Sequence, residues 1–306
     1  MRLAAFFKLI RWKNLLLILY VQILLKFLVF NSFNIETNLS LVQFIVLLIS
    51  ILLITAAGYI INDIFDLKTD LINKPQKVIV TKNFSLEKAQ QLYLVLNATG
   101  VILGVGLSLN IEKPSYSLIF IGTSLLLYYY YYYYSKKFKS KPLIGNLIVS
   151  FLIAFSISII YLVDINKTIQ TTNQQLIIDI ILGLSFFAFF INFIREIVKD
   201  IEDVKGDYNL KMNTLPILIV KYRTAKITSL LCVIPLGFLI YIVINIASIY
   251  KFTSIYLVLF TIIPLLYVAL KLQSVKSIKD FKKLSTILKI SMFLGVTSLI
   301  IFSLNT

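Results

Sequence analysis

The 306-residue chain contains no histidine and a single cysteine, Cys232. Without histidine, any acid–base or metal chemistry must use carboxylates, amides, tyrosine or lysine. A single cysteine excludes an intramolecular disulfide. Charged residues are also scarce, at 14% of the chain, whereas 59% of the residues are hydrophobic. This balance points away from a soluble domain, in which about a quarter of the residues are charged.

Apolar runs of about 20 residues recur along the whole chain, which is the length that a helix needs to cross a bilayer core. The runs are continuous rather than alternating, so they predict helices and not the strands of a β-barrel. We predict an all-α membrane protein, a single polytopic domain over residues 1–306, with nine transmembrane helices in a bundle around a central cavity. The predicted spans are 14–30, 40–61, 91–109, 117–134, 143–163, 176–194, 227–248, 253–270 and 284–303. No small-residue cleavage site follows the first run, so we expect no cleavable signal peptide.

The formal net charge of +16 would favour a nucleic-acid partner in a soluble protein, but here the basic residues gather in the segments between spans. Counted over those segments, Lys and Arg number 25 on one side of the membrane and 3 on the other, while Lys26 and Lys289 lie inside spans. The positive-inside rule makes the basic side cytoplasmic, and the N-terminus with it. We therefore expect a multi-pass protein of the cell membrane that binds no nucleic acid.

The stretch from Asn62 to Asp70 stands where the second apolar run stops. Asn62, Asp66 and Asp70 are spaced four residues apart, and Asp63 precedes Asp66 by three, so on a helix these side chains share one face. Carboxylates this close repel one another unless a cation lies between them. Hard divalent ions such as Mg²⁺ take carboxylate oxygens and share their other positions with substrate phosphates. The alternative is a solvated loop at a membrane surface, which would need no such spacing.

A second acidic stretch follows the sixth apolar run. Asp200, Asp203 and Asp207 repeat the Asp-x-x-Asp-x-x-x-Asp spacing of the first stretch. Both stretches fall on the predicted cytoplasmic side, in the segments 62–90 and 195–226, which are longer than the segments on the other side. We interpret these segments as helical caps over a cytoplasmic cavity. Acidic faces in two equivalent places predict two metal-binding walls around one diphosphate.

Basic residues flank both acidic stretches, namely Lys74 and Lys77 after the first and Arg195, Lys199 and Lys211 around the second. A diphosphate needs such cationic partners in addition to metal ions. The positive-inside bias accounts for single lysines equally well. Arg195 is the better candidate, because it lies near the end of an apolar run, where an unpaired charge is expensive. A simple ion pair with Glu196 is the alternative for Arg195.

Two further features lie near the predicted cytoplasmic ends of spans. Tyr128 to Tyr134 form an unbroken run whose side chains would point all round a helix. An aromatic belt at the membrane interface explains most of them, and a minority would face the cavity, where π faces suit a cation or a prenyl chain. Asn146 lies a little inside the fifth span, where an amide either faces the cavity or bonds a neighbouring helix.

Several segments together resemble the UbiA-type intramembrane prenyltransferases, and they come in that family's order. Asn62-x3-Asp66-x3-Asp70 looks like the first Asp-rich motif of the family, and Arg195 to Asp207 looks like the second. The other similar segments are Arg11-Trp12-Lys13-Asn14, Asn73-Lys74-Pro75-Gln76-Lys77, Tyr134-Ser135-Lys136 followed by Gly145-Asn146, and Asn213-Thr214-Leu215-Pro216. Lysines replace two arginines of the family after the first motif, and Val78 stands where its second proline would be. The second motif is most similar to the branch of digeranylgeranylglyceryl phosphate synthases, followed by chlorophyll synthases.

The resemblance implies a Mg²⁺-dependent enzyme that transfers a polyprenyl group from a polyprenyl diphosphate to a lipophilic acceptor. Geranylgeranylglyceryl phosphate is one such acceptor, and an aromatic quinone precursor is the alternative. The implied metal ligands are Asn62, Asp63, Asp66, Asp70, Asp200, Asp203 and Asp207. The implied catalytic residues are Asp66, Asp70, Asp203, Asp207 and Arg195. The implied substrate-binding residues are Arg11, Asn14, Lys74, Lys77, Tyr134, Lys136, Asn146, Lys199 and Lys211.

Two other classes fit less well. A CDP-alcohol phosphotransferase also uses an Asp-rich metal site, but the Asp-Gly and Ala-Arg elements of its signature are missing here. A cation-coupled transporter would place its charges near the membrane midplane in broken helices. In this chain the acidic residues stand at the ends of spans, and the spans are not interrupted by Gly or Pro.

Overall fold

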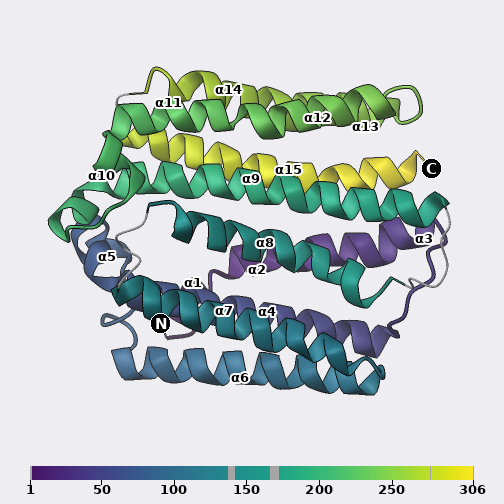
Figure 1. The fold of residues 1–306 in the computed structure, drawn as a ribbon, viewed down its shortest axis with the longest axis horizontal. Coiled ribbons are helices and arrows are strands. Elements are labelled where there is room, and N and C mark those ends of the chain that lie inside the picture. Colours follow the sequence, from purple (N-terminus) through teal and green to yellow (C-terminus); the bar gives the residue numbers. More distant parts are fainter. Residues whose placement is uncertain (1, 137–141, 166–171, 276, 306) are drawn as a thin grey trace. The chain divides into compact units, whose positions relative to one another are not determined.

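The computed structural model describes residues 2–136, 142–165, 172–275 and 277–305 (Figure 1). Secondary structure in this part of the chain is helical, and its β-type pairings are two isolated bridges, Thr37 with Ile165 and Val80 with Phe84. The all-α prediction is therefore confirmed. The chain divides into two compact units, which are described one at a time. That the whole chain forms a single polytopic domain stays a prediction.

The first unit comprises Met1–Gln22, Thr37–Lys139 and Leu162–Asn166. Its elements are α1 (Arg2–Leu9), α2 (Trp12–Ile23, all but the last residue), α4 (Leu41–Phe65), α5 (Leu67–Asn73), the 3₁₀ helix η2 (Pro75–Lys77), α6 (Leu86–Asn110), the 3₁₀ helix η3 (Pro114–Tyr116) and α7 (Ser117–Lys136).

The second unit comprises Ile23–Glu36, Ser140–Tyr161 and Lys167–Thr306. Its elements are the π-helix η1 (Leu24–Val29), α3 (Phe30–Ser32), α8 (Ile144–Val163, all but the last two residues), α9 (Thr172–Asn209), α10 (Leu215–Ile219), α11 (Lys221–Leu231), α12 (Val233–Ile246), α13 (Lys251–Leu257), the π-helix η5 (Val258–Ile262), α14 (Ile263–Leu272) and α15 (Ile278–Leu304).

Eight helical stretches of the described residues are long and apolar enough to cross a membrane. They are Trp12–Ser32, Leu41–Phe65, Leu86–Asn110, Ile144–Val163, Thr172–Asn209, Lys221–Ile246, Lys251–Leu272 and Ile278–Leu304. Each coincides with a predicted span. The remaining prediction, 117–134, falls on α7, whose run of tyrosines makes that helix less apolar. The protein is thus a multi-pass membrane protein, while the count of nine spans and the cytoplasmic caps stay predictions.

In the first unit α6 packs against both α4 and α7 (Figure 1). Two glycines of α6 allow this close approach. A Cβ atom at Gly100 would lie 2.7 Å from Cγ1 of Ile54, and Ser50 Oγ donates a hydrogen bond to the Gly100 carbonyl oxygen at 2.7 Å. A Cβ atom at Gly104 would lie 2.3 Å from Cγ of the buried Phe120 ring. Small residues at these positions are expected in a membrane, where helix association depends on close van der Waals packing.

We expect Gly104→Ala to destabilise the protein by about 1–3 kcal/mol, because the buried Phe120 ring cannot move away without disturbing α7. Gly106 is the matched control, since it lies on the same helix and a Cβ atom there would meet nothing within 4 Å. Gly106→Ala should be neutral or stabilising, because alanine favours a helix over glycine by about 1 kcal/mol. Thermal unfolding of the purified variants measures both effects. Equal unfolding temperatures for the two variants would contradict the close packing of α6 on α7.

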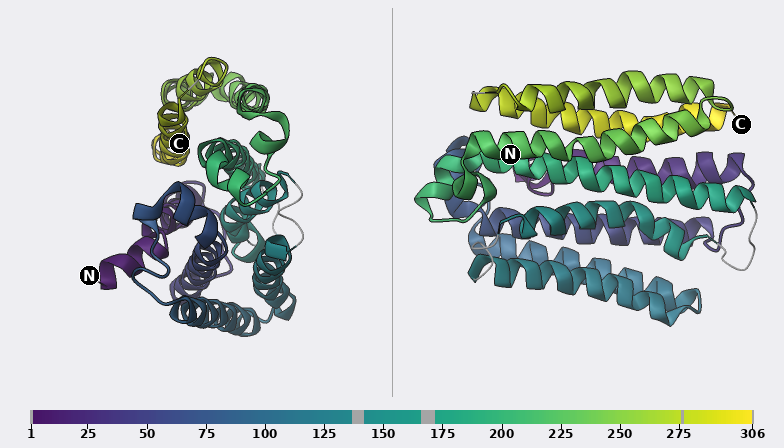
Figure 2. Two further views of the ribbon diagram at one scale, coloured as in Figure 1. Left: turned by 90° about the vertical axis from the view of Figure 1, so that its left-hand side faces the viewer. Right: turned by 45° about the horizontal axis from the view of Figure 1, so that its top comes forward.

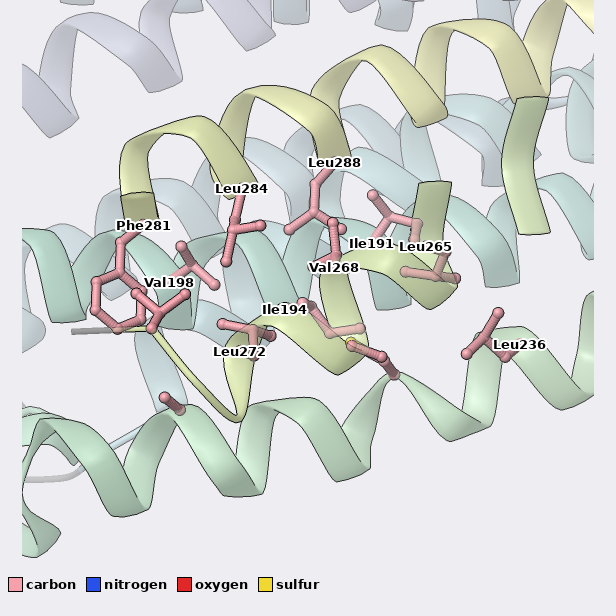
Figure 3. Close-up of a cluster of buried hydrophobic side chains, with 14 of the residues drawn as sticks. Ile191, Ile194, Val198, Leu236, Leu265, Val268, Leu272, Phe281, Leu284 and Leu288 are labelled. Atoms are coloured by element: carbon pink, nitrogen blue, oxygen red, sulfur yellow. The ribbon is translucent and has the colours of Figure 1, made fainter. Parts of the chain in front are cut away.

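The second unit is built around α9, which contacts α10, α11, α12 and α15 (Figures 1 and 2). Buried apolar side chains of α9, α11, α12, α14 and α15 form one cluster (Figure 3). On α9 the cluster takes Ile191, Ile194, Val198 and Ile201, whose spacing of three and four residues makes one face of this helix apolar. In lipid these contacts stabilise the unit through packing rather than through the hydrophobic effect, since lipid tails are as apolar as the side chains.

Polar side chains define where helices begin and how loops close in the first unit. Ser40 caps α4: its hydroxyl oxygen accepts from the Gln43 N–H at 3.4 Å, and Gln43 Oε1 accepts from the Ser40 N–H at 2.8 Å. The buried Asp164, to which the sequence assigns no role, accepts the Leu39 N–H at 2.9 Å through Oδ1. These bonds hold the loop before α4 against residues 162–165.

The helix α9 runs unbroken from Thr172 to Asn209, over 38 residues. At 1.5 Å per residue it is about 57 Å long, nearly twice the thickness of a bilayer core. α9 therefore continues past the end of the predicted span 176–194, and residues 195–209 of the segment interpreted as a helical cap extend this helix. After the uncharged residues 180–194 the helix carries charged residues from Arg195 on, so a change from apolar to charged side chains does not by itself end a helix.

Candidate active site

The first acidic stretch straddles a break between two helices. α4 ends at Phe65, Asp66 has φ −83° and ψ 0°, and α5 begins at Leu67. Hydrogen bonds between residues four apart continue across the break, from the Asp66 N–H to the Asn62 carbonyl at 2.9 Å and from the Asp70 N–H to the Asp66 carbonyl at 2.8 Å. In addition, Asn62 Nδ2 donates to Asp66 Oδ2 at 2.8 Å. The structure thus brings Asn62 and Asp66 together, with Asp70 one turn further along.

Asp63 lies in an ion pair with Arg11. The distance from Arg11 Nη2 to Asp63 Oδ1 is 2.7 Å, and the guanidinium carbon lies 5.0 Å from the centre of the Tyr59 ring. Arg11 has φ +50° and stands between α1 and α2, so the chain turns at this residue. The Asn14 N–H donates to the Arg11 carbonyl at 2.7 Å as α2 begins. The sequence did not predict a role for Tyr59, because its contact with Arg11 depends on this turn.

Lys74 and Lys77 follow directly after α5. The Lys74 N–H donates to the Asp70 carbonyl at 2.8 Å, and the Lys77 N–H donates to the Lys74 carbonyl at 2.8 Å. Lys82 Nζ donates to the Pro75 carbonyl at 2.6 Å, which closes the loop over η2. The side chain of Lys74 is half-buried, whereas Lys77 is exposed. Both lysines follow Asp70 within seven residues of the chain, and their role as phosphate ligands stays a prediction.

The second acidic stretch, Asp200 to Asp207, lies in the last three turns of α9. Glu196 Oε1 lies 2.5 Å from Lys199 Nζ and 3.5 Å from Arg195 Nη1. The suggested Arg195–Glu196 pair is present, but Lys199 is the nearer partner of the carboxylate. Glu196 therefore holds two cationic side chains at one end of the acidic stretch, a role that its spacing of three residues from Lys199 would have indicated.

Two carboxylates of this stretch have partners on other segments of the second unit. Asn146 Nδ2 on α8 donates to Asp200 Oδ2 at 2.7 Å. Asp207 is 5% exposed, and its Oδ2 accepts from Thr214 Oγ1 at 3.1 Å. Its carbonyl accepts from the Met212 N–H at 2.9 Å. The turn between α9 and α10 thus folds back on Asp207, and Thr214 is a site residue that sequence reasoning assigned no role.

The remaining predicted residues are less well defined by contacts. Lys211 is exposed in that same turn, with φ +52°. Asp203 is half-buried on α9, one turn from Asp207 and from Lys199. Tyr134 and Lys136 end α7, and their side chains lie outside what the structure describes. Their roles stay predictions.

The donor atoms of the two stretches fit Mg²⁺, which prefers carboxylate and amide oxygens. No group of three or more His, Cys, Asp or Glu side chains arranged for a metal occurs within the described residues.

Comparisons with known proteins agree on one family. A model of the UbiA prenyltransferase family matches residues 24–295. The chain is 31% identical to a digeranylgeranylglyceryl phosphate synthase of Saccharolobus solfataricus over 257 residues, 82% of each protein. A solved structure of a digeranylgeranylglyceryl phosphate synthase has a TM-score of 0.60 at 24% identity and covers 100% of this chain and 99% of its own. A UbiA homologue from Archaeoglobus fulgidus bound to DMAPP and Mg²⁺ has a TM-score of 0.53 at 17% identity, with 96% of this chain and 98% of that one covered. The two structures show a shared fold.

Proposed function

Because the chain belongs to the UbiA prenyltransferase family, we propose that it transfers a polyprenyl group from its diphosphate to a glycerol hydroxyl of geranylgeranylglyceryl phosphate. The family and the prenyltransferase activity are those that the sequence motifs predicted. The choice of acceptor rests on the 31% identity to a digeranylgeranylglyceryl phosphate synthase, which extends over 82% of this chain. We place the reaction on the cytoplasmic side, because 25 of the basic residues lie on that side of the predicted spans.

The observation that carries the proposal is the arrangement of charges at the end of α9. Glu196 holds Arg195 and Lys199 in place, and the carboxylates of Asp200 and Asp203 follow within the next turn. Fixed cations beside carboxylates are what a diphosphate and its metal ions require, since the cations bind phosphate oxygens and the carboxylates bind the metal. A solvated helix end would not need Asn146 to fix Asp200 from a second helix.

The proposed reaction breaks the bond between C1 of the prenyl group and the diphosphate oxygen, and the electron pair leaves with the diphosphate. Arg195 and Lys199, with Lys74 and Lys77, bind the leaving diphosphate and offset its growing charge. Mg²⁺ bound by the acidic stretches would supply further positive charge to the same oxygens. The acceptor hydroxyl oxygen then bonds to C1, and its proton passes to a carboxylate or to water, because the chain has no histidine.

Other side chains have supporting roles in this proposal. Asp63 holds Arg11 at the turn between α1 and α2, so that the arginine is in position for a phosphate oxygen; Asn14 follows one turn later. Asn146 and Thr214 orient Asp200 and Asp207. The aromatic face of Tyr134 would shield the allylic cation from water, and Lys136 and Lys211 would add positive charge near the substrate.

The test is an incubation of the purified full-length protein with radiolabelled geranylgeranyl diphosphate, Mg²⁺ and a panel of acceptors. The panel contains geranylgeranylglyceryl phosphate, 4-hydroxybenzoate, a dihydroxynaphthoate and homogentisate. We expect lipid-extractable product with geranylgeranylglyceryl phosphate and its loss on addition of EDTA. Product with an aromatic acceptor instead would overturn the proposed acceptor and keep prenyl transfer. Absence of both product and Mg²⁺-dependent diphosphate binding would overturn the proposed reaction.

A further inference from the structure

One face of α9 is polar beyond the acidic stretch itself. Asn192, Glu196, Lys199 and Asp203 follow one another at intervals of four, three and four residues, so their side chains share a face of the helix. Ile194 and Val198 point to the opposite side, into the apolar cluster with α11, α14 and α15 (Figure 3). Asn192 is thus the continuation of the charged face toward the membrane-spanning part of α9.

Asn192 is buried without a partner for its side-chain amide. The residue is 1% exposed, and its Nδ2 has no hydrogen-bond partner among the described residues. Two other asparagine Nδ2 donors of the described residues are paired: Asn146 Nδ2 donates to Asp200 Oδ2, and Asn97 Nδ2 donates to Ser124 Oγ at 2.7 Å. An unsatisfied buried donor destabilises a protein, so a native one calls for an explanation.

The position of Asn192 along the helix suggests what its amide is for. Toward the C-terminus the next side chain on the face is the charged Glu196. Toward the N-terminus the face continues with Phe189 and then with Ser185, whose hydroxyl already donates to the Ile181 carbonyl. Along this face the charged side chains thus give way to the neutral amide of Asn192, then to the Phe189 ring, and then to a serine whose hydroxyl is already bonded within its own helix.

We propose that Asn192 binds the lipid acceptor, with its Nδ2 donating a hydrogen bond to an uncharged glycerol oxygen. This inference rests on the proposed function. An acceptor of the proposed class has the same order of polarity as the face of α9, namely a charged phosphate, then neutral glycerol oxygens, then a hydrocarbon chain. With its phosphate among the cations near Lys199 and its chain along Phe189, the acceptor brings a glycerol oxygen to the level of Asn192. One hydrogen bond there orients the acceptor so that its single free hydroxyl faces the prenyl C1 atom.

The test compares steady-state kinetics and unfolding temperatures of full-length variants, with geranylgeranyl diphosphate, geranylgeranylglyceryl phosphate and Mg²⁺. We expect Asn192→Leu, which keeps the size of the side chain, to raise the acceptor KM about tenfold. A tenfold change corresponds to about 1.4 kcal/mol, which is the contribution of one hydrogen bond. The KM for the diphosphate should not change. The unfolding temperature should stay the same or rise, because the variant removes an unsatisfied buried donor.

Asn97→Leu is the matched control, because the Nδ2 donor of this asparagine already has an acceptor within the protein, Ser124 Oγ. It should lower the unfolding temperature and leave the acceptor KM unchanged. Asn192→Ala and Asn192→Ser form a second pair of similar size, in which serine restores a donor and should recover part of the acceptor affinity that alanine loses. If Asn192→Leu does not fold, this second pair still tests whether Asn192 donates a hydrogen bond to the acceptor.

Three outcomes overturn the inference. An unchanged acceptor KM in Asn192→Leu would show that the amide bonds an ordered water or nothing. An equal rise of both KM values would show a structural role. Equal acceptor KM values for Asn192→Ala and Asn192→Ser would exclude a hydrogen bond to the acceptor. If the unaltered protein makes no product with this acceptor, the proposed function itself fails, which is a different result from activity that Asn192 does not influence.

Discussion

Asp66→Ala should lower the rate of prenyl transfer by on the order of 10³-fold, because removing one group that stabilises the leaving charge costs about 10²–10³ and Asp66 also serves as a metal ligand in the proposal. The substitution should leave folding intact. Asp66 lies at the joint of α4 and α5, where the backbone hydrogen bonds from Asp66 to Asn62 and from Asp70 to Asp66 do not involve its side chain. The side chain accepts from Asn62 Nδ2 at 2.8 Å, and this amide is partly exposed, so that water replaces the lost acceptor.

Single-turnover formation of labelled product measures the effect, with Mg²⁺ varied over a wide range. Asp66→Asn should be nearly as slow as Asp66→Ala, because an amide keeps the shape and loses the charge that holds a divalent ion. Asp179→Ala is the matched control: that carboxylate accepts from Gln175 at 3.0 Å in an exposed pair near the start of α9. It should keep full activity. Full activity of Asp66→Ala at every Mg²⁺ concentration would remove Asp66 from the metal site.

Arg195→Gln should lower kcat by on the order of 10²-fold, since it removes a fixed cation that stabilises the leaving diphosphate. The KM for the prenyl diphosphate should rise by a smaller factor, because the charge on the diphosphate grows as the bond breaks. Arg195→Lys should recover only part of kcat. Lysine keeps the charge but binds phosphate as a point charge and not with the two-pronged geometry of a guanidinium.

Steady-state kinetics with varied prenyl diphosphate separates these effects. The matched control is Arg223→Gln on α11, which removes an equally basic but exposed side chain. The control should change neither kcat nor KM. An equal fall of kcat in both variants would mean that only the total positive charge of the protein matters and that Arg195 has no specific role. Asn192→Leu, by contrast, should act on the acceptor and leave the diphosphate KM unchanged.

The features that follow from local spacing were predictable from the sequence. The two acidic faces depend on intervals of three and four residues, which a helix turns into neighbours, and the spans depend on long apolar runs. For Asn146 the sequence allowed two alternatives, an amide that faces the cavity or one that bonds a neighbouring helix. In the structure its Nδ2 donates to Asp200 on α9. It also left Glu196 as a simple partner of Arg195, whereas the carboxylate binds Lys199 more closely.

The features that depend on turns were not predictable. Tyr59 meets Arg11 because the chain reverses at a residue with φ +50°, and Thr214 meets Asp207 because the turn after Asn209 folds back on α9. No periodicity connects these pairs. Asn192 was missed for another reason, because a single asparagine among phenylalanines and isoleucines does not interrupt the apolar run of a predicted span. Only the structure distinguishes it, since its Nδ2 is buried without a hydrogen-bond partner.

The unbroken course of α9 has a mechanical consequence. A helix that is packed along one side against an apolar cluster is stiff. Lys199, Asp200 and Asp203 therefore keep a fixed distance to the apolar cluster of the second unit. The first acidic stretch is built differently, because Asp66 interrupts the helical dihedral angles and leaves the short helix α5 attached through a joint. In the proposed reaction a prenyl diphosphate binds and free diphosphate leaves, and we therefore expect α5 rather than α9 to move between these two states. In a hydrogen–deuterium exchange experiment, the amides of Leu67–Asn73 would exchange early, while those around Val198 would still be protected.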